Sequence, residues 1–149
     1  MKPKISEERQ RRQRKYSNML VILAIMIVIS IASFVRGENA VGFDWKEDSV
    51  QITDPGGTAC TIRYADITDI ELIKHPNFGT CISGGSTSFW HYGKWENETW
   101  GQYTLCASTE PTLCIVMHTN ERIYVLSYES DDTTSALYDS IRQLLEAAK

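Results

Sequence analysis

Residues 102–128, QYTLCASTEPTLCIVMHTNERIYVLSY, decide the fold class of this chain. Apolar and polar side chains alternate in three short runs, and a period of two is typical of β-strands with one face in a core. Turn-forming residues separate the runs at 109–111 (TEP) and 120–121 (NE). The stretch therefore predicts three consecutive strands, over 102–107, 112–119 and 122–128.

The flanking sequence extends this pattern in both directions. Upstream, 50–52 and 58–64 alternate around a turn at 54–57 (DPGG), and 66–74 is predicted as a further strand. Downstream, an amphipathic helix follows, for which Asp131, Asp132 or Thr133 is the expected N-cap. Its apolar stripe consists of Leu137, Ile141, Leu144, Leu145 and Ala148. Six or so antiparallel strands and one terminal helix indicate a mainly β barrel or sandwich that the helix caps.

An uncharged run of 20 residues, 16–35 (YSNMLVILAIMIVISIASFV), precedes this domain. As a helix it is roughly 30 Å long, which matches the hydrocarbon core of a bilayer. A cleaved signal peptide begins in the same way, but this run is long for one and no small-x-small site follows it. The sequence favours an uncleaved, single-pass transmembrane helix through which the protein binds the lipid bilayer.

Charge is distributed unevenly around the run and predicts its orientation. Residues 1–15 hold seven basic and two acidic side chains, a balance of +5, whereas the chain from Arg36 onward holds 8 basic and 17 acidic side chains, a balance of −9. The positive-inside rule then places the basic tail, 1–15, in the cytoplasm and the domain outside it, at the cell membrane. A domain this acidic repels phosphate backbones, so nucleic acid is not an expected partner. We expect a juxtamembrane linker over 36–48 and the domain over 49–149.

The domain resembles the bacterial pleckstrin-homology (PH)-like domains, and most closely those that follow transmembrane segments. The similarity covers about Ser49 to Leu145 and rests on four pieces of sequence. These are Tyr64-x-Asp66-Ile67-x-x-Ile70, the stretch 79–101, Tyr103-x-Leu105, and 123–127 (IYVLS) before the helix.

This resemblance implies a bent antiparallel barrel capped by the C-terminal helix, no enzyme activity, no cofactor, and a role as a scaffold or interaction module. Eukaryotic relatives bind phosphoinositides through Lys and Arg residues around the first hairpin. This sequence has 54–57 (DPGG) at that place, with Arg63 as its only nearby base. Phosphoinositide binding is therefore not expected, and another protein or an envelope component is the expected partner.

Four cysteines, an even number, lie in a domain that we expect outside the cytoplasm. If 102–107 and 112–119 pair as a hairpin with Cys106 facing Cys114, one face of the hairpin becomes uniformly apolar. A disulfide between these two residues is then one possibility, and a pair of half-buried thiols is the other. The histidines show no ligand spacing, so no metal site is expected.

Aromatic residues gather among glycines in 78–103. The weak periodicity of 75–101 predicts mostly loop or irregular strand there. Trp90, Tyr92, Trp95 and Trp100 are the candidate binding residues, because aromatic side chains on hinged loops are common in recognition surfaces. The same rings could instead complete a small core or lie at the membrane interface.

Two functions follow from these observations. The first is a membrane-anchored, non-enzymatic binding or scaffold module, and it is favoured because no catalytic motif is present. The alternative is a cell-envelope hydrolase or sugar-binding protein that uses the aromatic, Gly-rich loop 78–103. A cleft with convergent carboxylates near residues 90–100 would favour this alternative.

Overall fold

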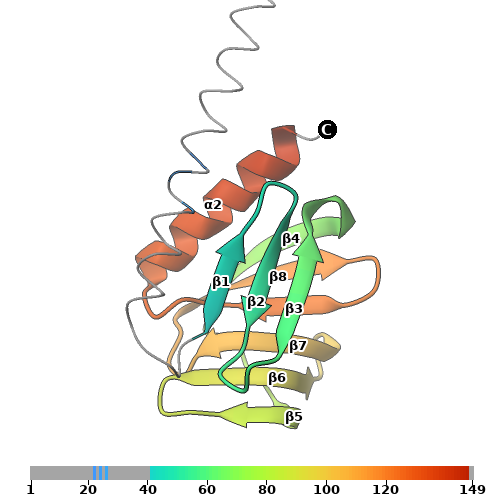
Figure 1. Ribbon diagram of the computed structural model, residues 1–149. Coiled ribbons are helices and arrows are strands. Elements are labelled where there is room, and N and C mark those ends of the chain that lie inside the picture. Colours follow the sequence, from blue (N-terminus) through green and yellow to red (C-terminus); the bar gives the residue numbers. More distant parts are fainter. Residues whose placement is uncertain (1–21, 23, 25, 27–40, 148–149) are drawn as a thin grey trace, which may run out of the picture.

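The computed structural model describes residues 22, 24, 26 and 41–147. Figure 1 shows two β-sheets whose strands cross, with a long helix, α2 (Asp131–Ala147), against one end. The small sheet has the order β1-β2-β3 and is antiparallel throughout. Its strands are β1 (Gly42–Trp45), β2 (Ser49–Thr53) and β3 (Ala59–Arg63).

A single 3-10 turn, η1 (Tyr64–Asp66), leads from the small sheet into the large one. The large sheet has the order β4-β8-β9-β7-β6-β5, and its only parallel pair within the described chain is β7 with β9. Its strands are β4 (Ile67–Lys74), β5 (Thr80–Ser86), β6 (Trp90–Asn97), β7 (Gly101–Ser108), β8 (Leu113–Thr119) and β9 (Ile123–Leu126). The sheets and the helix confirm a mainly β fold with one C-terminal helix, although the sheet is mixed rather than antiparallel.

Alternation along the strands of the large sheet produces two separate apolar layers. The main core lies on the face that meets the small sheet and α2, and its members include Val41, Phe43, Val50, Ile52, Ile62, Trp90, Cys106, Ile115, Met117, Leu126, Leu137 and Ile141. The outer core lies on the opposite face and consists of Trp95, Tyr103, Leu105, Ala107, Cys114, Val116 and Val125.

The connection from β4 to β5 helps to close the outer core. It begins where the His75 amide donates to the Thr112 carbonyl, 2.8 Å away, before β8. It ends beside β6 and β7, where the Tyr103 hydroxyl donates to the Phe78 carbonyl over 2.5 Å. The Phe78 side chain packs against the outer core. A connection of five residues thus links the two edge strands of the large sheet, which requires that sheet to be strongly curved.

Helix α2 covers the main core with the predicted stripe. Leu137 and Ile141 are completely buried, and Leu144 and Leu145 are partly buried against the same cluster. The N-cap differs from the expected one, because the Ser130 Oγ accepts the hydrogen bond from the Thr133 amide at 3.2 Å. Asp131 instead accepts a hydrogen bond from the amide of Leu113, 3.1 Å away.

Two expectations about organisation need correction, and a third is decided. The connector predicted over 36–48 already contains β1, because Phe43 and Trp45 are buried and pair across to β2. Of the two alternatives for 75–101, the structure has irregular strand, since β5 and β6 lie within it and their register shifts between Cys81 and Ser83. The turn at 54–57 forms as predicted, but it joins β2 to β3, and the first hairpin turns at Lys46–Asp48.

The predicted basic tail (1–15) and most of the predicted transmembrane helix (16–35) lie outside the described residues. Ile22, Ala24 and Met26 are described, and all three are helical. Within the described residues, no helix has the length and apolar character needed to cross a membrane.

Candidate functional site

The four aromatic residues predicted as a binding surface are divided between the two layers. Trp90 is 5% exposed in the main core, and Trp95 is 8% exposed in the outer core on the other face of β6. The Trp95 indole donates to the Tyr92 carbonyl at 3.1 Å. These two tryptophans therefore complete the cores and do not share a surface.

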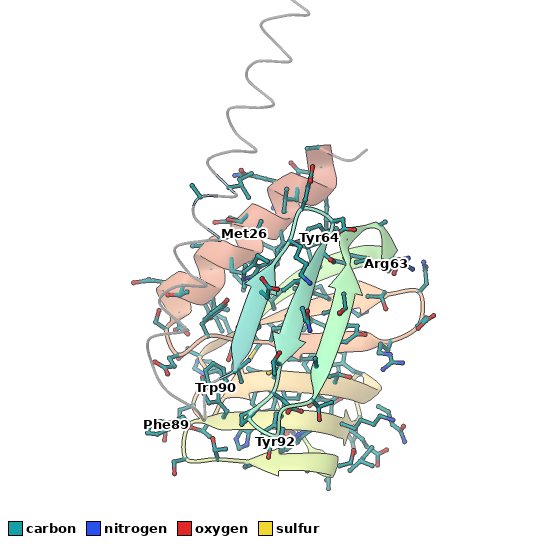
Figure 2. The ribbon with its side chains drawn as sticks, in the orientation of Figure 1. Met26, Arg63, Tyr64, Phe89, Trp90 and Tyr92 are labelled. Carbon is teal, nitrogen blue, oxygen red and sulfur yellow. The ribbon has the colours of Figure 1, made fainter. Side chains whose placement is uncertain are left out.

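The other two aromatic residues are half-buried. Trp100 packs edge-on against Tyr103, with ring centroids 5.2 Å apart. The Tyr92 ring lies over Gly56 and Gly85, where an added methyl group would be 3.6 Å and 3.2 Å from the nearest Tyr92 atom. The β2–β3 turn thus rests on β6 through Tyr92. In Figure 2, Phe89 instead projects from the domain beside Trp90, and it is 68% exposed.

Of the two possibilities for Cys106 and Cys114, the structure has two free thiols and not a disulfide. Strand β9 lies between β7 and β8, so the two strands are not a hairpin. Cys106 belongs to the main core and Cys114 to the outer core, on opposite faces of the sheet. All four cysteines are free thiols.

The buried thiols are protonated at neutral pH. Burial raises the pKa of Cys114 to about 12, and burial together with the negative charge of Asp54 raises the pKa of Cys106 far above its ordinary range. Burial also raises the pKa of Cys60, although the positive charge of Arg122 opposes part of that rise. Because the thiolate is the nucleophile, these cysteines act as apolar packing groups.

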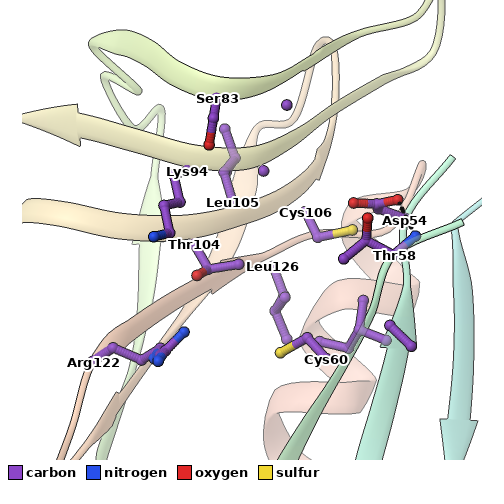
Figure 3. A pocket seen from close by; sticks show the side chains of 14 residues that line it. Asp54, Thr58, Cys60, Ser83, Lys94, Thr104, Leu105, Cys106, Arg122 and Leu126 are labelled. Atoms are coloured by element: carbon purple, nitrogen blue, oxygen red, sulfur yellow. Dashed lines mark hydrogen bonds between the residues drawn. The ribbon is translucent and has the colours of Figure 1, made fainter. Parts of the chain in front are cut away.

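A pocket of about 340 Å³ lies between the β2–β3 turn and the face of the large sheet (Figure 3). This volume is near the lower end for small-molecule sites. Its apolar lining includes Cys106 and Leu126 from the large sheet and Ile52 and Cys60 from the small sheet. Its polar groups are contributed by Asp54, Thr58, Ser83, Lys94, Thr104 and Arg122.

Charge is separated within this pocket. Figure 3 shows Lys94, Thr104 and Arg122 at one end and Asp54 with Thr58 at the other. The Asp54 carboxylate is already engaged, since its Oδ1 accepts from the Thr58 amide at 2.9 Å. The ion pairs of the described chain use Lys46, Arg63, His118 and Arg142, but not Lys94 or Arg122. Two cations without a carboxylate partner among the described residues therefore face one end of the pocket.

Sequence reasoning missed this pocket. Its lining comes from six strands and a turn that are widely separated in the chain, and Lys94 and Arg122 carry no local signal. The pairing of β6 with β7 brings Lys94 opposite Thr104, and the pairing of β7 with β9 brings Thr104 opposite Tyr124, two residues after Arg122. Only the sheet order could have indicated that the two cations share a site.

Groups for catalysis or metal binding are sparse. In the described part of the chain, no three His, Cys, Asp or Glu side chains are grouped closely enough to hold a metal ion. The nearest approach to a catalytic pair is His91 Nδ1 with Ser86 Oγ at 2.6 Å. The other His91 side-chain contacts are with the rings of Phe78 and Trp95, and among the described contacts no carboxylate orients this imidazole.

Comparison with known proteins agrees with the architecture. A family model described as "Bacterial PH domain" matches residues 42–137, from the first residue of β1 into α2. No curated protein and no solved structure matches the chain. The matched region covers both sheets and the first part of the helix that caps them, which is more than half of the chain, so the chain belongs to the bacterial PH domain family.

Proposed function

We propose that this protein is a membrane-anchored, non-enzymatic binding module that takes its ligand in the pocket between the β2–β3 turn and the large sheet. The observation that carries the ligand site is the pair of cations, Lys94 and Arg122, at one end of a pocket whose single carboxylate, Asp54, lies at the other end. The chain from Arg36 onward has a net charge of −9, so it does not need these two cations to stay soluble. Cations that are kept apart from carboxylates are instead suited to binding an anion.

The pocket chemistry defines a ligand class. A compact organic anion would place its charge between Lys94 and Arg122, within reach of the Thr104 hydroxyl, and its apolar body against Ile52, Cys106 and Leu126. Such a group could be the end of a protein side chain or part of an envelope component. Phosphoinositides remain poor candidates, because the first hairpin, Lys46–Asp48, has Lys46 as its one base, and Asp44 pairs with that base over 3.7 Å.

Benzoate is a suitable probe of this site, with benzamide as a neutral molecule of nearly the same shape. We expect saturation-transfer NMR on the full chain in nanodiscs to detect benzoate binding and to find benzamide several-fold weaker. Lys94→Gln and Arg122→Gln are each expected to weaken benzoate by about threefold to tenfold, the range for a partly exposed charge contact.

Lys74→Gln is the matched control, because Lys74 is an exposed lysine of β4 outside the pocket. Equal binding of benzoate and benzamide, or an equal loss in the Lys74 variant, would show that the two cations form no anion site.

The membrane part of the proposal rests on the uncharged run 16–35 and the charge difference across it, with the N-terminus in the cytoplasm and the domain outside. We expect trypsin added to intact cells to cleave the domain, where Arg63, Lys94 and Arg122 are exposed, and to leave an N-terminal tag uncut. A domain that survives while control ectodomains are cleaved would reverse the orientation.

The hydrolase alternative has one supporting contact, the pair of Ser86 and His91. It lacks the arrangement that the alternative requires, because Trp90 and Trp95 are core residues and the pocket has Asp54 as its single carboxylate. Members of the PH-like family are generally non-enzymatic, and a binding role therefore accounts for more of the observations.

A further inference from the structure

Three residues from the predicted transmembrane run are described, and they differ in burial. Ile22 and Met26 are one helical turn apart and are 7% and 2% exposed, whereas Ala24 between them is exposed. Positions i and i+4 share one face of a helix, and position i+2 lies on the far side. One face of this helix is therefore packed and the other is open.

The packed face belongs to the domain. Ile22 and Met26 are members of the main core, in the same cluster as Val41, Phe43 and Leu137. Figure 2 shows Met26 on the α2 side of the domain. The two side chains thus belong to an apolar layer that also holds side chains from the start of the small sheet and from α2.

This packing cannot coexist with a centred transmembrane position. In a helix over 16–35, Met26 is nine residues from Val35, so about 14 Å of hydrocarbon would separate it from the end of the run. A domain outside the membrane cannot reach that depth. Contact with the core and insertion into the bilayer are therefore alternative states of the same residues.

We propose that the α2 side of the domain is a docking surface for the chain's own Ile22 and Met26, and that insertion of these residues into a bilayer uncovers it. The proposal rests on the proposed membrane anchoring. An apolar side chain leaves water in either state, so the exchange moves Ile22 and Met26 between two apolar environments. The main core keeps this cover without a bilayer and loses it when one is present.

Cysteine accessibility separates the two states. The background is the full chain with Cys81→Ser, which removes the exposed native thiol. A single new cysteine is added to it, by Met26→Cys in one variant and by Ala24→Cys in the other. The labelling of each variant is compared with that of the background. The chain is produced by cell-free synthesis with or without phosphatidylethanolamine–phosphatidylglycerol liposomes. A membrane-impermeant maleimide then labels accessible thiols in the soluble or liposome-bound fraction.

Without liposomes, we expect labelling at position 24 and protection at position 26; equal labelling or equal protection at both positions overturns the docking. With liposomes, we expect protection at both positions. If position 24 is still labelled with liposomes while position 26 is protected, docking stands but release and the proposed anchoring fail. Labelling at both positions with liposomes overturns release into the bilayer.

A second pair of variants tests whether the contact contributes to the fold. Met26→Asp and Ala24→Asp impose similar costs on membrane insertion, because the two positions lie at nearly the same depth. Without liposomes, only Met26→Asp is expected to lower the Tm of the domain, by at least about 4 °C. Equal Tm values for the two variants overturn the docking surface.

Discussion

Replacing Trp90 with alanine is expected to lower the free energy of unfolding by about 3–5 kcal/mol, the range for a large aromatic residue removed from a core. Trp90 is 5% exposed at the first position of β6, in the layer between the two sheets. The backbone amide of residue 90 does not contribute to this loss of stability. It donates to the Thr87 Oγ1, 2.9 Å away, and the substitution leaves that hydrogen bond in place. The expected effect comes from the cavity that the indole leaves.

Phe89→Ala is the matched control, because Phe89 immediately precedes Trp90, at the end of the β5–β6 connection. The Phe89 side chain is 68% exposed, so its removal is expected to change stability by less than about 0.5 kcal/mol. Urea-dependent pulse proteolysis of the full chain in detergent measures both variants on one scale. A stable Trp90→Ala protein would contradict its assignment to the core and return Trp90 to the candidate binding residues.

Local patterns in the sequence predicted the last third of the domain well. Strands β7, β8 and β9 and the stripe of α2 lie where alternation and amphipathicity place them, because both signals depend on neighbours within a few residues. The pairing of these strands was not local. The turn at 109–111 suggested a hairpin of β7 with β8, yet β9 pairs with both and separates them.

The error in strand pairing also explains why a disulfide between Cys106 and Cys114 remained possible from the sequence. A register that placed Cys106 opposite Cys114 made one apolar face, but the structure divides the same residues between two apolar layers. In β7, both Leu105 and Cys106 are buried although they point to opposite faces. A strand buried on both sides does not alternate clearly, so its inward face could not be assigned from the sequence.

The sequence could not separate loop from irregular strand over 75–101, because the glycines there interrupt the alternation. Gly84 and Gly93 face each other across β5 and β6, and their φ angles are 110° and 100°. The register also shifts between Cys81 and Ser83. These glycines lie within a distorted strand pair rather than in a turn, and the sequence alone does not distinguish the two.

Gly93→Ala is accordingly expected to lower the free energy of unfolding by about 2–5 kcal/mol. The left-handed backbone accounts for about 1–2 kcal/mol of this loss. The remainder, about 1–3 kcal/mol, is the cost of overpacking, because a Cβ at Gly93 would overlap the Ser83 carbonyl oxygen and the Gly84 Cα. The β5–β6 pair would have to separate at that point.

Gly57→Ala separates the cost of the left-handed backbone from the cost of overpacking. Gly57 has a φ of 83° in the β2–β3 turn, and a Cβ there meets no atom within 4 Å. Its substitution is expected to cost only the backbone strain, about 1–2 kcal/mol. Hydrogen exchange should also show faster exchange of the β5 and β6 amides in Gly93→Ala, with β8 and β9 unchanged. Equal costs for the two variants would mean that the close approach of β5 to β6 does not require glycine, and that the distorted pair tolerates a wider spacing.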